Sequence, residues 1–444
     1  MLPQLRRLER KYRDELVVVG VHSAKFPTEK ETANVRQAVM RLSLDHPVIN
    51  DADFAVWQAY AVRAWPTLIF VDPQGRVIGK HEGEAPFEAL DRLVGDLVRQ
   101  YDAQGLLTRA PLPLALERER EPAGYLAFPG KVATDAATGR LAVADSGHHR
   151  IVVADLEGHV ERVIGSGEVG LADGSLAAAR FHGPQGLALD GDLLYVADTE
   201  NHALRLVDLA AGTVGTLAGS GEQATTLSAG GPARQVALRS PWDLALGGRR
   251  LYVAMAGSHQ LWALDLNRDT IAPFAGSGRE GLHDGPRAEA WLAQPSGLAL
   301  QGERLYFADS ETSAIRYVDL ASGRVETLVG TGLFDFGDRD GVGDAVLLQH
   351  PLGVAVADDL LLVADTYNHR LKRLDPRTRQ CRAWTGSGAP GYRDGAAEAA
   401  QFYEPSGLSL PAGHGRVYVA DTNNHRVRVV ELDDGAVSTL ELQA

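Results

Sequence analysis

The strongest constraint on the fold is a unit that recurs six times between residues 128 and 444. Each copy contains an apolar run that ends in Val-Ala-Asp, Phe-Ala-Asp or, in the third copy, Val-Ala-Met. The runs end at Asp145, Asp198, Met255, Asp309, Asp365 and Asp421, so that 53 to 57 residues separate successive copies. A repeat of this length indicates an array of similar structural units rather than one irregular domain.

Each unit holds four runs of strand length. In the fifth copy they are Gly353–Val356, Leu360–Ala364, Leu371–Leu374 and Cys381–Trp384, and turn-forming residues stand between them. Four such strands form one small antiparallel sheet, which cannot bury its own faces without neighbours. Radial repetition of four-stranded sheets is a β-propeller, so the sequence predicts a six-bladed propeller over residues 128–444.

The segment between the second and third strands reads DTENHALRLV, DTYNHRLKRL and DTNNHRVRVV in three of the copies. This recurring Asn-His-x-aliphatic pattern resembles the NHL repeat. The third and fourth copies depart from it, reading GSHQLWAL and ETSAIRYV. The resemblance extends from Phe128 to about Leu442 and implies a propeller that recognises a partner.

Histidines and aspartates recur at fixed positions of the repeat. We expect the histidines to make the same turn hydrogen bond in each blade, because symmetric copies lie on a ring too wide for one metal ion. We expect the aspartates that end the second strands to cap turns. The histidines are His149, His202, His259, His369 and His425.

Some six-bladed propellers hold calcium with carboxylates that line the central channel. Here the residues that follow the first-strand proline are Gln185, Trp242, Ser296, Leu352 and Ser406. Because this set contains no carboxylate, we expect no metal site and no cofactor.

Aromatic residues mark several departures from the repeat and could form a ligand face at the mouth of the propeller. The alternative is ordinary packing between blades. These residues are Trp242, Trp262, Trp291, Phe334, Tyr392 and Tyr403.

The net charge of −14 resides in residues 111–444, most of which form the propeller, because residues 1–110 contain 15 basic and 15 acidic side chains. An acidic propeller repels phosphate, so a nucleic-acid partner is not expected. A local basic cluster in the fifth copy leaves RNA binding open as an alternative to a solvated blade edge. It comprises Arg370, Lys372, Arg373, Arg377 and Arg379.

Residues 1–102 predict a separate α/β domain. Apolar periodicity favours helices over residues 3–13, 28–44, 52–60 and 86–101, and strands over 16–22, 48–50, 67–71 and 77–81. Thr28 and Glu31 match a capping box at the start of the second helix.

This α/β domain resembles the thioredoxin-like fold of the redoxin (alkyl hydroperoxide reductase-like) kind. The resemblance rests on Val17–Val21, the segment Val62–Thr67 and the hairpin FVDPQGRVIGKHEG. It implies a cis peptide bond at Pro66 and a Cys-x-x-Cys strand just before the first helix. That strand is not in the sequence, so we expect the true start to lie upstream. The alternative is a packing or binding module with open sheet edges beside Val17–Val21.

Residues 103–127 are expected to link the domains, with a possible edge strand over Pro111–Leu116 packed near the closure of the first and sixth blades. Cys381 is the only cysteine, and no signal peptide or membrane-length apolar run is present. A monomer without membrane contacts, in the reducing cytoplasm, is the expectation.

Three functions remain open from the sequence. The first is an intracellular binding or scaffold protein whose propeller recognises a protein or small-molecule partner. The second is a thiol–disulfide oxidoreductase or peroxide-reducing redoxin whose cysteine-bearing segment is missing. The third is RNA binding through the basic cluster. No catalytic residue is assigned, because no thiolate is available in the thioredoxin-like domain.

Overall fold

The computed structural model describes residues 1–110, 113–114, 116 and 124–443. Its contacts divide the chain into two compact units, Met1–Ala123 and Gly124–Ala444. The possible edge strand over Pro111–Leu116 lies largely outside the described residues. Among those that are described, no helix combines the length and the apolar character needed to cross a membrane.

The first unit has the α/β order that its sequence predicts. The cis Trp65–Pro66 bond agrees with the thioredoxin-like resemblance. The elements are α1 (Leu2–Lys11), β1 (Gly20–His22), the 3₁₀ turn η1 (Pro27–Lys30), α2 (Thr32–Arg41), β2 (Val48–Asn50), α3 (Ala55–Ala59), β3 (Thr67–Val71), β4 (Val77–Glu82) and α4 (Phe87–Ala103).

The predicted capping box at Thr28 is wrong, because the predicted helix divides into η1 and α2. Glu29, not Glu31, folds back: its Oε2 accepts hydrogen bonds from the backbone N–H groups of Lys25 and Phe26, each at 3.1 Å. The chain then turns at Glu31 before α2 begins. Pro27 at the first turn position favours this early, separate turn.

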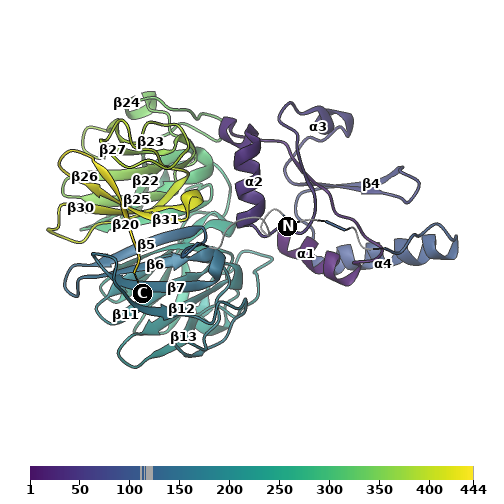
Figure 1. Ribbon diagram of the computed structural model, residues 1–444, viewed down its shortest axis with the longest axis horizontal. Coiled ribbons are helices and arrows are strands. Elements are labelled where there is room, and N and C mark those ends of the chain that lie inside the picture. Colours follow the sequence, from purple (N-terminus) through teal and green to yellow (C-terminus); the bar gives the residue numbers. More distant parts are fainter. Residues whose placement is uncertain (111–112, 115, 117–123, 444) are drawn as a thin grey trace. The chain divides into compact units, whose positions relative to one another are not determined.

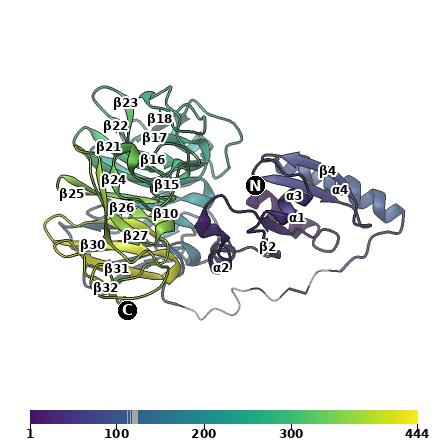
Figure 2. The same cartoon turned by 90° about the horizontal axis from the view of Figure 1, so that it is seen from above.

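The core of the first unit lies between α1 and α4, which run side by side in Figures 1 and 2. Leu8, Leu90 and Val94 are buried there. At the edge of this contact Asp91 accepts hydrogen bonds from Tyr12 Oη at 2.8 Å and from Lys11 Nζ at 2.6 Å. The two helices therefore join through an apolar stripe with a polar margin.

The sheet of the first unit is split. β1 pairs only with β2 and β3 pairs only with β4 among the described strands. Val17, Val19 and Val21 are between 42 and 53% exposed. The open edge expected beside Val17–Val21 is therefore present, and the predicted strand of residues 16–22 shortens to three residues.

The second unit is a six-bladed β-propeller, drawn from teal to yellow in Figure 1. In each blade four antiparallel strands follow one another in sequence order, and blades two to five add a two-residue outer strand. Blade one consists of β5 (Pro129–Asp135), β6 (Arg140–Asp145), β7 (Arg150–Asp155) and β8 (Val160–Ile164). Blade two consists of β10 (Pro184–Asp190), β11 (Leu193–Asp198), β12 (Ala203–Asp208), β13 (Thr213–Ala218) and outer β9 (Gly174–Ser175). Blade three consists of β15 (Pro241–Gly247), β16 (Arg250–Met255), β17 (Gln260–Asp265), β18 (Thr270–Ala275) and outer β14 (Gly231–Pro232).

Blades four to six continue the pattern, and the four strands predicted in blade five are observed to within one residue at each end. Blade four consists of β20 (Pro295–Gln301), β21 (Arg304–Asp309), β22 (Ala314–Asp319), β23 (Arg324–Val329) and outer β19 (Gly285–Pro286). Blade five consists of β25 (Gly353–Ala357), β26 (Leu360–Asp365), β27 (Arg370–Asp375), β28 (Gln380–Thr385) and outer β24 (Gly341–Val342). Blade six consists of β29 (Pro405–Ser409), β30 (Arg416–Asp421), β31 (Arg426–Glu431) and β32 (Val437–Leu440).

Every blade except blade three has a buried carboxylate at the end of its second strand. In blade two, Asp198 Oδ1 accepts a hydrogen bond from His182 N at 2.8 Å, and Oδ2 accepts one from Arg205 Nη1 at 3.0 Å. Both side chains are fully buried. The turn-capping role predicted for the aspartates is confirmed, but the cation seven residues later was not predicted. The equivalent pairs are Asp309–Arg316, Asp365–Lys372 and Asp421–Arg428.

Blade three replaces both members of this ion pair with apolar residues. Met255 stands in the place of the aspartate and Trp262 in the place of the arginine, and both are buried. Met255 Sδ takes over the capping role by accepting a hydrogen bond from Arg239 N at 3.4 Å. Replacing both partners avoids a buried, unpaired charge.

The periodic histidines join neighbouring blades. In blade two, His202 Nδ1 accepts a hydrogen bond at 3.1 Å from the backbone N–H of Ser240, which precedes the first strand of blade three. The predicted repeated hydrogen bond is thus confirmed, although it connects two blades rather than closing one turn. Ser313 Oγ is the acceptor in blade four, at 3.2 Å from His350 N. The other bonds, at 3.0–3.3 Å, run from Gly183 to His149, Gln294 to His259, Glu404 to His369 and Phe128 to His425.

A second set of blade-to-blade bonds comes from the hydroxyl that follows each buried aspartate. Thr422 Oγ1 donates to Pro129 O at 2.8 Å, which closes the ring between blades six and one. The closure is extended where Val160 N donates to Gln443 O at 2.8 Å. The remaining donors are Ser146 to Pro184, Thr199 to Pro241, Ser310 to Pro351 and Thr366 to Pro405.

The compensated pair of blade three predicts coupling between the two members of the ion pair in blade four. Arg316→Trp alone leaves Asp309 buried without its cation, and we expect it to lower the free energy of unfolding by about 3–5 kcal/mol. Adding Asp309→Met should recover at least about 1 kcal/mol relative to the sum of the single changes. Urea unfolding of the four proteins measures this coupling, and strictly additive effects would contradict it.

The inter-blade histidines predict a stability that depends on pH. Burial lowers the pKa of His369 to about 4, and its Nδ1 must stay unprotonated to accept the bond from Glu404 N. The unfolded chain, with an imidazole pKa of about 6.5, takes up a proton in the window between these values that the folded chain does not. The contribution of His369 is therefore complete above that window and is lost as the pH falls through it.

His369→Ser is the matched variant, because Ser313 accepts the same bond in blade four without titrating. Between pH 7 and pH 4 we expect the free energy of unfolding of the unmodified protein to fall by up to about 3 kcal/mol relative to the variant. Burial raises the pKa of Asp365 to about 6 and acts in the opposite direction, but this effect is common to both proteins and cancels. Parallel pH profiles would contradict the expectation.

Candidate functional site

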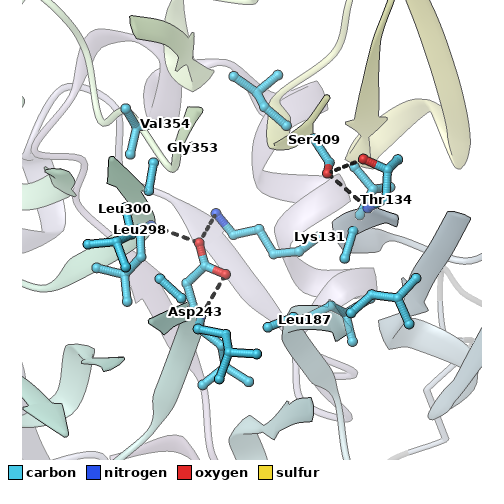
Figure 3. A pocket seen from close by; sticks show the side chains of 18 residues that line it. Lys131, Thr134, Leu187, Asp243, Leu298, Leu300, Gly353, Val354 and Ser409 are labelled. Carbon is cyan, nitrogen blue, oxygen red and sulfur yellow. Dashed lines mark hydrogen bonds and ion pairs between the residues drawn. The ribbon is translucent and has the colours of Figure 1, made fainter. Parts of the chain in front are cut away.

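A cavity of about 350 Å³ lies on the axis of the propeller (Figure 3). All six blades contribute to it through their first strands. We call this cavity the axial funnel. Its lining residues are 131–134, 187–189, 243–246, 298–300, 353–354 and 408–409.

The funnel is built in layers, because equivalent positions of the six first strands lie at the same height. Counted from the proline that opens each first strand or, in blade five, stands two residues before it, the fourth residue is valine or leucine, as in Leu187 and Val354. The fifth is alanine in five blades and Ser409 in blade six. The sixth is again leucine or valine except for Thr134 in blade one. Most of these aliphatic side chains are buried between the blades, so the accessible surface of the funnel is more polar than apolar.

An ion pair across the axis forms the floor of the funnel. Lys131 of blade one and Asp243 of blade three point toward each other in Figure 3, with Nζ and Oδ2 3.6 Å apart. Both side chains are buried. Lys131 Nζ also donates to the carbonyl oxygens of Leu352 and Ser406. The axis is therefore closed at this level by contacts from four blades.

The floor groups satisfy one another. Asp243 accepts hydrogen bonds from the backbone N–H groups of Leu244 and Leu298, each at 2.9 Å. Burial lowers the pKa of Lys131 and raises that of Asp243, while their mutual attraction opposes both shifts. Among the described residues, Lys131 and Asp243 are the only acidic or basic side chains that line the funnel.

The sequence contains a signal for this floor in the third residue counted from the first-strand proline. Four blades have glycine at this position, and Lys131 and Asp243 occupy it in the other two. Glycine is needed because neighbouring strands nearly touch there: a Cβ at Gly353 would lie 2.2 Å from Ser406 O. We considered the second residues of these strands, which contain no carboxylate, and so missed the opposite charges one position later.

One hydroxyl pair stands among the aliphatic side chains of the lining. Ser409 Oγ accepts a hydrogen bond from Thr134 N at 2.9 Å and lies 2.8 Å from Thr134 Oγ1 (Figure 3). The buried side-chain atoms that lack a hydrogen-bond partner in the described part of the chain all lie outside the funnel.

None of the six aromatic residues proposed for a ligand face lines the funnel in the part of the chain that is described. Trp262 is buried in blade three, and its Nε1 donates to Gln260 Oε1 at 3.1 Å. Trp291 packs against His283, and Tyr403 against His369.

The other three aromatic residues have different surroundings. Trp242 is half-buried and precedes the floor residue Asp243. Tyr392 Oη lies 2.9 Å from Thr439 Oγ1, and Phe334 is 71% exposed. A ligand face formed by the six aromatic residues stays a prediction.

The basic cluster of blade five is largely matched within the protein. Lys372 is buried and lies 2.7 Å from Asp338, and Arg370 also contacts Asp338, at 3.3 Å. Arg379 pairs with Asp344 at 2.6 Å.

The two remaining members of the basic cluster differ from each other. Arg373 lies over the ring of Trp384, with its guanidinium carbon 4.2 Å from the ring centroid, whereas Arg377 is exposed. RNA binding through this cluster stays a prediction.

Cys381 lies inside blade five rather than at a surface. It is fully buried in the core next to Leu374, and burial raises the pKa of its thiol to about 12. A thiol that stays protonated and inaccessible is a poor nucleophile. Cys381 therefore serves packing.

Comparison with known families agrees with both units. A thioredoxin-like family matches residues 1–77, and the NHL repeat matches residues 126–154, 181–205, 348–374 and 402–430. These four repeats are blades one, two, five and six. Blades three and four, which depart from the Asn-His pattern, are not among the matched segments.

Relatives share the full length of this chain. NHL repeat-containing protein 2 of Homo sapiens is 40% identical over 476 residues, covering 100% of this chain and 66% of that protein. Protein SUPPRESSOR OF QUENCHING 1, chloroplastic, of Arabidopsis thaliana is 43% identical over 465 residues, covering 100% and 44%. The chain thus spans two thirds or less of the length of these relatives. It is an NHL-repeat β-propeller protein with an N-terminal thioredoxin-like domain, homologous to NHL repeat-containing protein 2.

Proposed function

We propose that the chain is a binding or scaffold protein whose propeller recognises its partner at the axial funnel. The observation that carries this proposal is the funnel itself, because a cavity of about 350 Å³ lies within the range of ligand sites in proteins. The cavity sits where the first strands of all six blades meet. A recess built from six strands suits recognition of a partner.

The chemistry of the lining supports binding rather than catalysis. Lys131 and Asp243 bond to each other and to backbone groups, so neither is free to transfer a proton or attack a substrate. The rest of the lining is aliphatic apart from the hydroxyls of Thr134 and Ser409. A catalytic site needs a titratable or nucleophilic group within reach of its substrate.

The redox alternative stays a prediction that depends on a longer chain. The 444 residues contain one cysteine, and Cys381 is buried in blade five. A Cys-x-x-Cys directly upstream of Met1, detected by the intact mass of the protein from its native cells, would support an oxidoreductase. A monomer in a reducing cytoplasm remains part of the proposal, on the evidence of the single buried thiol.

Blocking the funnel is expected to abolish partner binding. Ala299 lines the funnel at the alanine layer, and Ala299→Phe would fill it. We expect affinity capture from native cells, read by mass spectrometry, to lose the propeller's partner by at least about tenfold.

Ala321→Phe is the matched control, because it adds the same side chain to the same blade at an exposed turn. Thermal melting checks that both variants fold, and Ala299→Leu replaces the larger change if the phenylalanine variant melts early. A partner retained equally by all variants would show that the funnel is not the recognition site.

A further inference from the structure

Blades one and six meet at a junction that has no linker, because they are not consecutive in the chain. We call this contact the unlinked junction. Each of the two blades takes its four strands from one continuous stretch, β5 to β8 and β29 to β32, and they share none of the described strands. At every other junction a linker keeps the two blades together. Separation of blades one and six therefore gains the most conformational freedom, since no linker limits how far they move apart.

The hydrogen bonds of the repeat do not compensate for the missing linker. At the unlinked junction Phe128 N donates to His425 Nδ1 at 3.0 Å, and Thr422 Oγ1 donates to Pro129 O at 2.8 Å. Bonds of the same two kinds occur at linked junctions as well. Any compensation must therefore come from residues that depart from the repeat.

Two such departures are Thr134 and Ser409. Ser409 Oγ of blade six accepts a hydrogen bond from Thr134 N of blade one at 2.9 Å, and the two hydroxyl oxygens are 2.8 Å apart. At the next junction the equivalent residues are Ala133 of blade one and Leu189 of blade two, whose side chains cannot form hydrogen bonds. Both hydroxyls thus lie at the unlinked junction.

Lys131 of blade one is a third departure at the same junction. Its ammonium donates to Ser406 O of blade six at 3.3 Å and to Leu352 O of blade five. It also lies 3.6 Å from Asp243 Oδ2 of blade three (Figure 3), and Asp243 accepts a hydrogen bond from Leu298 N of blade four at 2.9 Å. One side chain of blade one therefore contacts three other blades directly and a fourth through Asp243.

We propose that Lys131, Thr134, Asp243 and Ser409 hold the ring of blades closed at the unlinked junction. We call these four residues the axial clasp. The clasp takes the place of the missing linker, which explains why three of its four residues belong to blades one and six. Without the clasp, the unlinked junction is the first place at which the propeller opens. This inference does not depend on what the funnel binds.

The alternative is that these residues stabilise the whole propeller without favouring any junction. A buried ion pair is often no more stabilising than apolar residues of the same size, so the pair alone does not decide between the two possibilities. They differ in where the structure opens locally. Local opening is measured by the exchange of backbone amide hydrogens with solvent.

Six equivalent backbone amides report on the six junctions. Each belongs to the residue before a first strand and donates to a histidine or serine of the preceding blade, so it exchanges when its own junction opens. The amide of Phe128 reports on the unlinked junction. The other five amides are those of Gly183, Ser240, Gln294, His350 and Glu404.

The test replaces the clasp by the residues of the repeat in the full chain. Lys131→Gly and Asp243→Gly restore the two glycines together, so that no buried charge is left unpaired. Thr134→Val and Ser409→Ala remove the two hydroxyls. We expect hydrogen exchange, resolved to single residues by mass spectrometry, to become at least about tenfold faster at Phe128 and to change less than about threefold at the other five amides.

Thr199→Val is the matched control, because it removes a buried hydrogen bond to Pro241 O at a junction that has a linker. We expect it to leave exchange at Phe128 unchanged. Thermal melting checks that each variant folds. If the fourfold variant does not fold, Thr134→Val with Ser409→Ala replaces it, with an expected acceleration at Phe128 of about threefold or more.

A chemical rescue tests the contribution of the ammonium of Lys131. Lys131→Gly alone leaves Asp243 buried without its cation, so we expect faster exchange at Phe128. Added n-butylammonium, which has the same carbon chain and charge as the lost side chain, should slow this exchange again. It should have no effect on the variant that also carries Asp243→Gly. A variant that n-butylammonium does not rescue would remove Lys131 from the clasp.

Three results would overturn the inference. Equal acceleration at all six amides would mean that the four residues stabilise the propeller as a whole. Unchanged exchange at Phe128 would mean that other contacts, such as the bond from Val160 N to Gln443 O, hold the junction. Acceleration at Phe128 by Thr199→Val to the same extent as by loss of the clasp would show that the ring opens as one unit.

Discussion

The propeller depends on one hydrogen bond made six times. The residue before each first strand donates its N–H to a histidine or serine of the preceding blade. Both residues of each bond have positive φ, between 46 and 57°, a conformation that most side chains disfavour. The bond therefore fixes two unusual backbone conformations at once and brings the first strands to the axis at a defined distance. The funnel exists because these six strands are held at one height and approach closely enough to require glycine.

Much of this architecture can be predicted from the single sequence, because residues that recur at a fixed period indicate repeated structural units. Strand positions, blade number and the structural role of the histidines all follow from residues that recur at one period. The direction of the bond from His202 to Ser240 could not be predicted, since periodicity says that a residue is used in each blade but not what it reaches. The same limit hid Arg205, whose partner Asp198 was recognised only as a turn cap.

The thioredoxin-like unit shows the opposite balance. Its element order and the cis bond at Pro66 follow from local patterns and from the resemblance, whereas the length of the strand before His22 does not. A continuous apolar run such as Leu16–Val21 predicts a strand covered on both faces. In the structure only Gly20–His22 forms a strand, and it pairs with β2 on one side. The apolar run therefore predicts more burial of its valine side chains than is observed among the described residues. Strand length is set by the neighbours, which a single run of residues does not reveal.

A departure from the repeat can be assessed by asking whether a second, complementary change accompanies it. Met255 and Trp262 replace an ion pair together, Lys131 and Asp243 replace two glycines with opposite charges, and Thr134 and Ser409 replace two apolar residues with hydroxyls that face each other. In each case the second change satisfies the first, so stability alone accounts for both. Trp262, Trp291 and Tyr403 are likewise accounted for by packing within the propeller. A departure from the repeat that lacks a complementary change is not explained by folding, and it is therefore where recognition of a partner is best sought.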